Sequence, residues 1–435
     1  MLALLLLISC NVIFQTAASP VPGGPTGQQT NLVKQWNTTG NQYPTVFIHG
    51  WLGWGEANPR FGIQNYWGGV TQNILDTLRS QGYVVSAPGV GPLSSNWERA
   101  AEAFAQITAT RTDYGVARSH QFGHKRFGQD HTGKPLVPGF LKNGSSTKIN
   151  LVAHSMGGPT ARLLVHLLCA NTVCSPLYWT NRTQSYVNGV FSIAGVYQGT
   201  PFDDYLQSNS KFFGFIKKAI LSLVGINDLN NLVYDLQLSH WGLSQQPNES
   251  VESYFARVEK SQWLNTKSNA LFDLSVKSLN DPLISFVKNV PEVTYFSSAG
   301  ITTTFDGQDA HAEDSTLIFL IPAAEIIGSY SNASLPILST FTPKEWRQND
   351  GLVPLASSRG PTSGFVAFPL DLQSGNENAL ALSAPRKTPG KGVFNFVGSL
   401  DETDHMALIG SVDLVSGLRD RYYLNILSLL SSLSA

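Results

Sequence analysis

Ser155 lies in a segment whose residue types suit nucleophilic chemistry, Leu151-Val152-Ala153-His154-Ser155-Met156-Gly157-Gly158. A β-prone run from Lys148 to Ala153 leads into Ser155, and the glycines after it leave room for a helix to begin close by. Small neighbours are needed because a nucleophile at such a strand-to-helix turn has a strained backbone. The pattern predicts a serine hydrolase. The alternative is a surface turn that contains an ordinary serine.

A serine nucleophile needs an imidazole to take its proton and a carboxylate to fix the imidazole tautomer. In α/β-hydrolases the acid and the histidine follow the serine along the chain. His405 stands in a loop directly after the strand-like run Val393 to Val397, and Asp350 stands in a turn before that run. We therefore expect Asp350 and His405 to complete a triad with Ser155. His311, the other late histidine, is less well placed.

The oxyanion that forms during attack on an ester needs two backbone N–H donors. The strand-like run Thr45 to Ile48 leads into a loop rich in glycine and tryptophan, residues 49–55, which is placed to supply one donor. In this kind of site the residue after the nucleophile supplies the other. We expect the N–H groups of Trp51 and Met156 to be the donors. A packing turn is the alternative for the loop.

Strand-like and helix-like segments alternate along the chain. The expected strands lie at 45–48, 83–86, 148–153, 187–194, 293–298, 365–368 and 393–397, and the expected helices at 65–80, 100–108, 160–169 and 418–433. This order predicts an α/β fold with a mostly parallel sheet and helices on both of its faces. We expect one α/β-hydrolase domain over residues 43–435, preceded by an irregular arm at 19–42.

Composition and the first residues bear on partners and compartment. A net charge of −1 gives no electrostatic reason to expect nucleic acid or an anionic membrane as a partner. Residues 1–18 contain an apolar stretch too short to span a bilayer and end in Thr16-Ala17-Ala18, which predicts a signal peptide and a secreted protein without a transmembrane segment. An uncleaved anchor is the alternative.

Secretion carries two further expectations. After the signal peptide is removed, Cys169 and Cys174 are the only cysteines, and in an oxidising compartment we expect them to form a disulfide. A pair of buried thiols is the alternative. N-glycosylation sequons, which are compatible with secretion but common in a chain of this composition, begin at Asn37, Asn143, Asn181, Asn248 and Asn332.

An insertion of different character separates the core segments at about residues 200–290. Its clearest part, Lys211 to Gly225, has a narrow polar stripe, and apolar side chains fill most of the remaining helical surface. So broad an apolar arc needs to be covered. It is either a core helix or a lid that covers an apolar acyl-binding cleft and exposes that face at an oil–water interface, and the Ser155 segment favours the lid.

Several short motifs resemble the secreted true lipases of bacilli and staphylococci. They are His49-Gly50-Trp51, Phe61-Gly62, Tyr66-Trp67-Gly68-Gly69, the run 90–97, Asp113-Tyr114-Gly115, the run 123–128, Trp241-Gly242-Leu243, Asn349-Asp350-Gly351 and Asp404-His405. The resemblance runs from about residue 43 to the C-terminal helix. It implies the triad and oxyanion residues named above, a lid that includes 211–225, and triacylglycerol as the substrate class.

The metal sites of these lipases are poorly matched. The bacillus members bind zinc through two Asp and two His, and the matching positions here are Glu98, Arg118, His124 and Ser239. Only His124 is retained, and an arginine cannot be a ligand, so zinc is not expected. Glu98 and Arg118 could instead form an ion pair. His120 and His240 lie near the lost positions and leave a shifted site open.

Calcium is not expected either. The family has an acidic residue two places after the catalytic histidine. In this chain Ala407 occupies that place, although Asp413 could offer one ligand. No cofactor is therefore required by the expected chemistry.

These observations together predict a secreted lipase that hydrolyses carboxylic esters of triacylglycerols through an acyl-enzyme, with the lipid substrate at an oil–water interface as its partner. A carboxylesterase for small soluble esters or a lipid acyltransferase would use the same triad. A catalytically silent lipid-binding protein on the same fold is the alternative from another class.

Overall fold

The computed structural model describes residues 43–56, 65–69, 72–141, 148–168, 185–208, 214, 235–331, 341–361, 365–367, 388–411 and 418–433. The expected signal peptide and arm, both cysteines of the expected disulfide, and all of Lys211 to Gly225 except Gly214 lie outside these residues. Asp413 also lies outside them. Within the described ranges, no helix has the length and apolar character that crossing a membrane requires.

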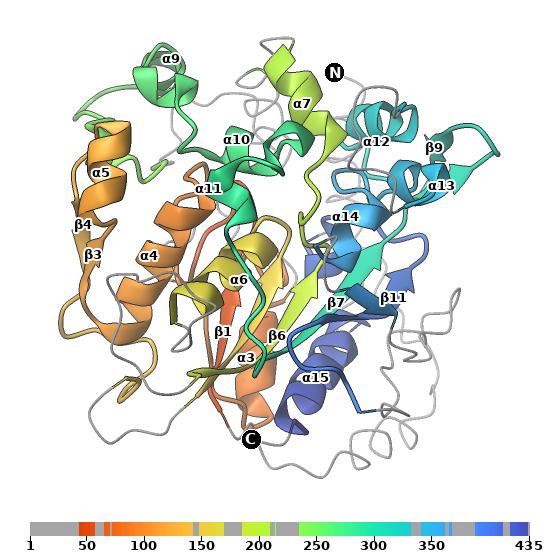
Figure 1. Cartoon of the computed structure of the whole chain (residues 1–435), viewed down its shortest axis with the longest axis horizontal. Coiled ribbons are helices and arrows are strands. Elements are labelled where there is room, and N and C mark those ends of the chain that lie inside the picture. The colour runs from red at the N-terminus through yellow and green to blue at the C-terminus, as the bar shows by residue number, and fades with distance from the viewer. Residues whose placement is uncertain are drawn as a thin grey trace, which may run out of the picture.

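A seven-stranded sheet forms the centre of the molecule, with the strand order β10-β11-β7-β6-β5-β1-β2 (Figure 1). Every neighbouring pair in it is parallel. The strands are β1 (Thr45–Ile48), β2 (Val85–Ser86), β5 (Ile149–His154), β6 (Val187–Ile193), β7 (Thr294–Gly300), β10 (Phe365–Ala367) and β11 (Phe394–Leu400). The sequence predicted each of these strands to within a few residues.

Among the described residues, two short antiparallel strand pairs lie outside the sheet, and the sequence did not predict them. They pair β3 (Arg111–Asp113) with β4 (Phe127–Asp130) and β8 (Thr303–Phe305) with β9 (Ala310–Ala312).

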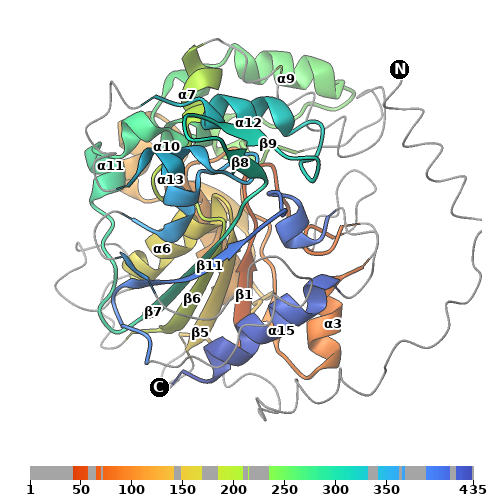
Figure 2. The ribbon, with the colours of Figure 1, turned by 90° about the vertical axis from the view of Figure 1, so that its right-hand side faces the viewer.

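The helices of the α/β core cover both faces of the sheet, as Figure 2 shows. On one face lie α3 (Ile74–Ser80) and α15 (Leu418–Ser431), and on the other lie α4 (Asn96–Thr108) and α6 (Gly157–Leu168). The remaining helices within the described residues are α5 (Val116–Phe122), α7 (Pro201–Ser208), η2 (Ser239–Trp241), α9 (Val251–Glu259), η3 (Gln262–Asn265), α10 (Ala270–Leu274), η4 (Val276–Ser278), α11 (Pro282–Ser285), α12 (Ile321–Gly328), α13 (Pro343–Arg347), α14 (Leu355–Arg359) and η7 (Ala407–Ile409).

The alternation of side chains along each strand builds a separate apolar core on each face. In β1, Phe47 packs with α3 and α15, whereas Val46 and Ile48 pack with α4 and α6. In β6, Phe191 and Val190 divide between the two cores in the same way. Strands that are buried on both faces explain the almost continuous apolar runs of the sequence, and the predicted parallel α/β sheet is confirmed.

The helix α4 begins four positions before the start that its apolar pattern predicted, because Ser95 and Glu98 form a capping box. The Ser95 hydroxyl accepts the Glu98 N–H, and the Glu98 carboxylate accepts the Ser95 N–H at 3.1 Å. Such a box satisfies N–H groups that have no acceptor within the helix. It also brings Glu98 and the next residue, Arg99, into the helix as fully buried side chains.

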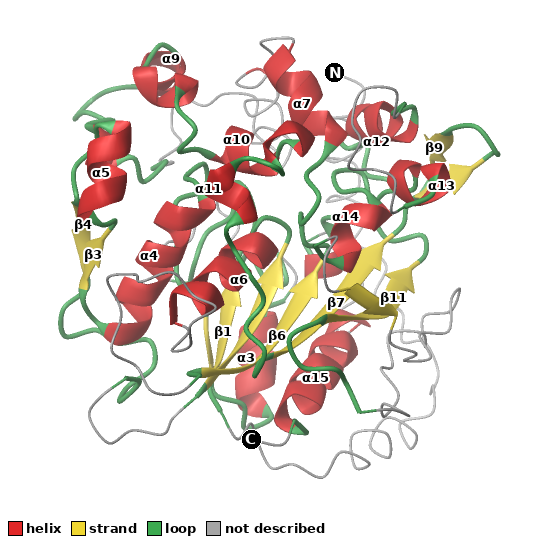
Figure 3. Cartoon of the chain, viewed as in Figure 1, coloured by secondary structure: helices red, strands yellow, loops and turns green. Residues whose placement is uncertain are grey.

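The described part of the 200–290 insertion lies above the carboxyl ends of the strands, where α7, α9 and α10 gather with α12 (Figure 3). These helices share an apolar core of their own, separate from the two cores beside the sheet, and Leu52 of the loop after β1 packs into it. The insertion therefore covers the edge of the sheet at which the loops that follow β1 and β5 meet.

His166 in α6 gives a prediction about pH and stability. Its side chain is 1% exposed, and its Nδ1 accepts the Lys288 N–H at 3.3 Å. Burial outweighs this hydrogen bond and lowers the pKa of His166 from 6.5 to about 4. Between these values the unfolded chain binds a proton that the folded protein does not, so stability falls as the pH decreases from 6.5 to 4.

We expect His166→Gln to lose less thermal stability than the wild type on acidification, by roughly 3 °C at pH 4.5. Melting temperatures measured by differential scanning calorimetry between pH 7.5 and 4.5 check this. The same substitution at exposed His120 is the control and should follow the wild type. Parallel curves for His166→Gln and the wild type would contradict the assignment.

Candidate active site

Ser155, the predicted nucleophile, lies on the turn between β5 and α6. Its backbone has φ 57°, in the left-handed region that non-glycine residues rarely adopt. The turn is tight: a side chain on Gly157 would place its Cβ 2.3 Å from the Ile48 carbonyl oxygen. The Ser155 N–H donates to the Ile193 carbonyl at 2.9 Å, which ties the turn to the end of β6. The strand, elbow and helix predicted around Ser155 are thus present.

Asp350 and His405 come together although they lie 55 residues apart in the chain. Nδ1 of His405 donates to Oδ2 of Asp350 at 2.8 Å, and the His405 N–H donates to the Asp350 carbonyl at 2.7 Å. The other carboxylate oxygen accepts the N–H groups of Leu352 and Val353 at 3.1 and 2.8 Å. With its proton on Nδ1, the imidazole of His405 has a lone pair on Nε2, the form that a general base requires.

Both members of this pair are shielded from water, since Asp350 is 0% and His405 3% exposed. His311, the other late histidine, lies elsewhere on β9 with a side chain that is 56% exposed. Its Nδ1 lies 3.1 Å from Oε2 of Glu325, and the hydrogen bond between them raises the pKa of His311. His405 is therefore the late histidine that pairs with Asp350.

The loop after β1 lies directly against Ser155. A Cβ on Gly50 would lie 2.7 Å from the Cβ of Ser155, so only glycine fits at this approach. Two hydrogen bonds hold the carbonyl of Gly50: it accepts from His49 Nδ1 at 2.8 Å and from Arg99 Nη1 at 3.5 Å. Because the peptide is trans and planar, anchoring this carbonyl turns the N–H of Trp51 in the opposite direction.

Met156 is held in a comparable way. The carbonyl of Ser155 accepts the N–H of Gly158 at 2.9 Å, which fixes the orientation of the peptide that carries the Met156 N–H. The side chain of Met156 is fully buried in a small apolar cluster against which Trp51 packs. Both predicted oxyanion donors therefore belong to peptides with anchored carbonyls, and their side chains share one cluster.

Arg99 is a supporting residue that sequence reasoning missed. It is 0% exposed, and its guanidinium donates to the carbonyls of His49 and Gly91 and to the Thr160 hydroxyl. These acceptors belong to the loop after β1, the loop after β2 and the first turn of α6. The sequence offered one signal for Arg99. It directly follows Glu98, a residue of the capping box, and so lies in the first turn of a helix that must pack on the sheet.

Two aromatic neighbours of the site were also missed. Tyr66 accepts the Gly50 N–H at 2.8 Å and contacts Nδ1 of His154 at 2.7 Å. His154 directly precedes Ser155, and its Nε2 lies 3.1 Å from the His405 carbonyl oxygen. Tyr66 belongs to one of the motifs that carried the family resemblance, but no sequence pattern indicates what its hydroxyl contacts.

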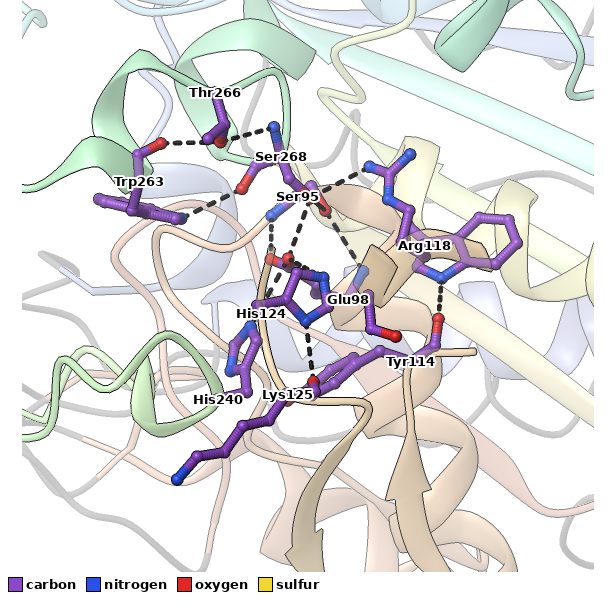
Figure 4. Close-up of polar contacts among 12 residues, drawn as sticks. Ser95, Glu98, Tyr114, Arg118, His124, Lys125, His240, Trp263, Thr266 and Ser268 are labelled. Carbon is purple, nitrogen blue, oxygen red and sulfur yellow. Dashed lines mark hydrogen bonds and ion pairs between the residues drawn. The ribbon is translucent and has the colours of Figure 1, made fainter. Parts of the chain in front are cut away.

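A second polar cluster lies around Glu98, at the positions that match the family's zinc ligands (Figure 4). Nε2 of His124 and Nε2 of His240 lie 3.8 and 3.5 Å from Oε1 of Glu98. The Ser268 hydroxyl donates to the same oxygen at 3.0 Å and accepts from Arg118 at 3.2 Å. Arg118 thus reaches Glu98 through Ser268, which differs from the direct ion pair that we expected.

This donor set does not fit the zinc site of the family. Ser239 is exposed at the fourth matching position, and its neighbour His240 faces Glu98 instead. Burial raises the pKa of Glu98, but the hydrogen bond to His240 and the nearby charges of His240, His124 and Arg118 outweigh it, so the net pKa lies below its usual value. Across the described ranges, no group of three or more His, Cys, Asp or Glu side chains could hold a metal ion.

The loop around His405 is closed by hydrogen bonds within the protein. Asp404 is 1% exposed and accepts the N–H groups of Met406, Ala407 and Leu317 at 2.8–3.0 Å. At the position where the family has an acidic calcium ligand, the Ala407 side chain carries no donor atom.

Comparisons with known proteins show the family of the chain. The profile of a family described as "Lipase-like, C-terminal domain" matches residues 41–421. Lipase 2 of Staphylococcus aureus is 32% identical over 336 residues, which cover 74% of this chain and 45% of that protein. Lipase 1 of S. aureus is 30% identical over 350 residues, which cover 77% of this chain and 48% of that protein. The chain spans about half the length of these curated relatives.

Solved structures share the fold over most of the chain. EstA of Clostridium botulinum superposes with a TM-score of 0.74 and 30% identity, covering 91% of this chain and 88% of that one. Lipase 1 of Pelosinus fermentans superposes with a TM-score of 0.72 and 30% identity, covering 91% of this chain and 100% of that one. Staphylococcus hyicus lipase shares the fold with a TM-score of 0.66 and 24% identity, covering 89% of this chain and 93% of that one. With this fold and this family match, the chain belongs to the family of staphylococcal-type bacterial lipases.

Proposed function

We propose that the protein is a secreted triacylglycerol lipase that acts through Ser155, His405 and Asp350 and an acyl-enzyme. The observations that carry the proposal are the buried His405–Asp350 hydrogen bond of 2.8 Å and the position of Ser155, at φ 57°, on the turn after β5. Membership of a lipase family supports hydrolysis of a carboxylic ester. Secretion would follow from cleavage of a signal peptide at residues 1–18.

In the proposed reaction, Nε2 of His405 takes the proton of the Ser155 hydroxyl as its oxygen attacks the ester carbonyl. Asp350 holds the imidazole in the required tautomer and stabilises the imidazolium. The N–H groups of Trp51 and Met156 donate to the oxyanion. His405 then returns the proton to the leaving alcohol, and water hydrolyses the acyl-enzyme by the same steps in reverse order.

The triad is tested by substitution. We expect Ser155→Ala, His405→Ala and Asp350→Asn each to lower kcat on a soluble p-nitrophenyl ester by about 10⁴-fold, because the three groups act as one unit. Melting temperatures should show that the variants remain folded. Ser80→Ala, at an exposed serine, is the control and should retain full activity. Activity within tenfold of the wild type in any triad variant removes that residue from the mechanism.

The substrate class needs a separate test. We expect the wild-type rate on a triglyceride of medium chain length to rise when its concentration passes the solubility limit, because an apolar lid should open at an oil–water interface. Rates measured in a pH-stat across that limit check the expectation. A rate that saturates below the limit and does not rise at the emulsion would instead indicate a carboxylesterase for soluble esters.

We also propose that neither zinc nor another cofactor is needed. The support is the donor set around Glu98, in which Arg118 and an exposed Ser239 occupy two of the positions that match zinc ligands. Purified protein should contain less than about 0.1 zinc per chain, and incubation with EDTA should leave its melting temperature unchanged within about 1 °C. Stoichiometric zinc, or a clear loss of stability on chelation, would contradict this proposal.

A further inference from the structure

Tyr66 and His154 form a hydrogen-bonded connection between the loop that carries Trp51 and the backbone of His405. It begins at the Gly50 N–H, which donates to the Tyr66 oxygen at 2.8 Å. The Tyr66 oxygen lies 2.7 Å from Nδ1 of His154, and Nε2 of His154 lies 3.1 Å from the His405 carbonyl oxygen. Tyr66, His154 and His405 are 7%, 1% and 3% exposed, so water does not compete for these contacts.

The direction of each hydrogen bond follows from the acceptor at its end. The His405 carbonyl can only accept, so the proton of the His154 imidazole must lie on Nε2. Nδ1 of His154 is then an acceptor, and the Tyr66 O–H donates to it. The Tyr66 oxygen keeps a lone pair for the Gly50 N–H. One neutral tautomer of His154 thus satisfies every group. Burial and, to a smaller extent, the nearby charge of His405 hold the pKa of His154 well below its usual value.

The connection completes the restraints on His405. Asp350 already holds this residue through its Nδ1 and its N–H, as described above. The carbonyl of His405 is the remaining main-chain group, and His154 binds it. The two imidazole rings also lie with their centroids 4.5 Å apart. His154, which directly precedes Ser155, therefore binds the main chain of His405, the proposed base.

We propose that Tyr66 and His154 are positioning residues, which fix His405 relative to Ser155 and to the Gly50–Trp51 loop through the hydrogen bonds on either side of His154. This inference rests on the proposed hydrolase function. Neither side chain is assigned a contact with substrate. Their effect is on geometry, and displacement of a reacting group by about 1 Å can lower a rate by two orders of magnitude.

The first test removes only the Tyr66 hydroxyl. We expect Tyr66→Phe to lower kcat on a soluble p-nitrophenyl ester by about ten- to a hundredfold, with KM changed less than about threefold, because geometry of the reacting groups is lost while substrate contacts remain. Rates are normalised to active sites titrated with a p-nitrophenyl phosphonate. An unchanged kcat per titrated site, with only a lower melting temperature, would overturn the proposal and leave a structural role.

Tyr83→Phe is the matched control. Tyr83 is 8% exposed, close to the value for Tyr66, and its hydroxyl lies 3.1 Å from Oγ of Ser428, away from the Ser155 loop. Loss of this buried hydrogen bond should lower the melting temperature by an amount comparable to that of Tyr66→Phe. Its kcat should stay within about twofold of the wild type. A similar fall of kcat in both variants would show that general destabilisation is the cause.

Two substitutions of His154 separate its contacts. In His154→Gln the side-chain amide can still donate to the His405 carbonyl, whereas in His154→Asn it can reach only the Tyr66 hydroxyl. We expect the glutamine variant to retain at least fivefold more kcat than the asparagine variant at equal KM. The reverse order, or equal rates, would overturn the role of the contact between His154 and His405.

One measurement does not depend on catalysis. The imidazole ¹⁵N chemical shifts of the resting protein at pH 7 should show His154 neutral, with its proton on Nε2. A proton on Nδ1 would overturn the proposed arrangement even in an active enzyme. Failure of the proposed function is distinguishable, because wild-type protein would then hydrolyse no ester and its Ser155 would not be labelled by the phosphonate.

Discussion

One buried guanidinium connects the segments on which the candidate site is built. Arg99 donates to the His49 carbonyl, the Gly91 carbonyl and the Thr160 hydroxyl, and none of its surface reaches water. A cation in such surroundings is stable only while its hydrogen bonds are complete. The loops after β1 and β2 and the first turn of α6 therefore cannot shift independently, and the approach of Gly50 to Ser155 depends on this restraint.

At two places one of two adjacent residues supports the site and the other has a proposed chemical role. His154 binds the His405 carbonyl, while Ser155 occupies the elbow. Asp404 binds the N–H groups of its own loop, and His405 reaches Asp350. In each pair the supporting side chain is buried, so the neighbouring group is held by contacts that substrate does not disturb.

Much of this arrangement could be read from the sequence, because it depends on local patterns. Apolar runs identified the parallel strands, and the small residues around Ser155 identified the elbow. Asp350 and His405 could be proposed from their order and from the strand that precedes His405, and the structure brings them within a hydrogen bond. Roles as nucleophile, base and acid remain predictions that the kinetic tests address.

The remaining features depend on contacts between distant segments, which no local pattern encodes. The acceptors of Arg99 are main-chain carbonyls of other loops, and every residue type supplies such groups. In η2 the side chain of His240, and not that of Ser239, faces Glu98. The residue that faces Glu98 is therefore one position later than the residue that matches the family's zinc ligand. The strands of the pairs β3–β4 and β8–β9 are short, so their sequence patterns are weak. The start of α4 was readable from Ser95 and Glu98 and was missed.

The backbone at Ser155 has a consequence for how this position changes over evolutionary time. At φ 57° a glycine would be free of a strain that costs a serine on the order of 1 kcal/mol, so selection for stability alone favours replacing the serine. A chain on this fold that had lost its chemistry would drift towards glycine there. The hydroxyl thus stands at a backbone position that costs stability, as the proposed nucleophile would require.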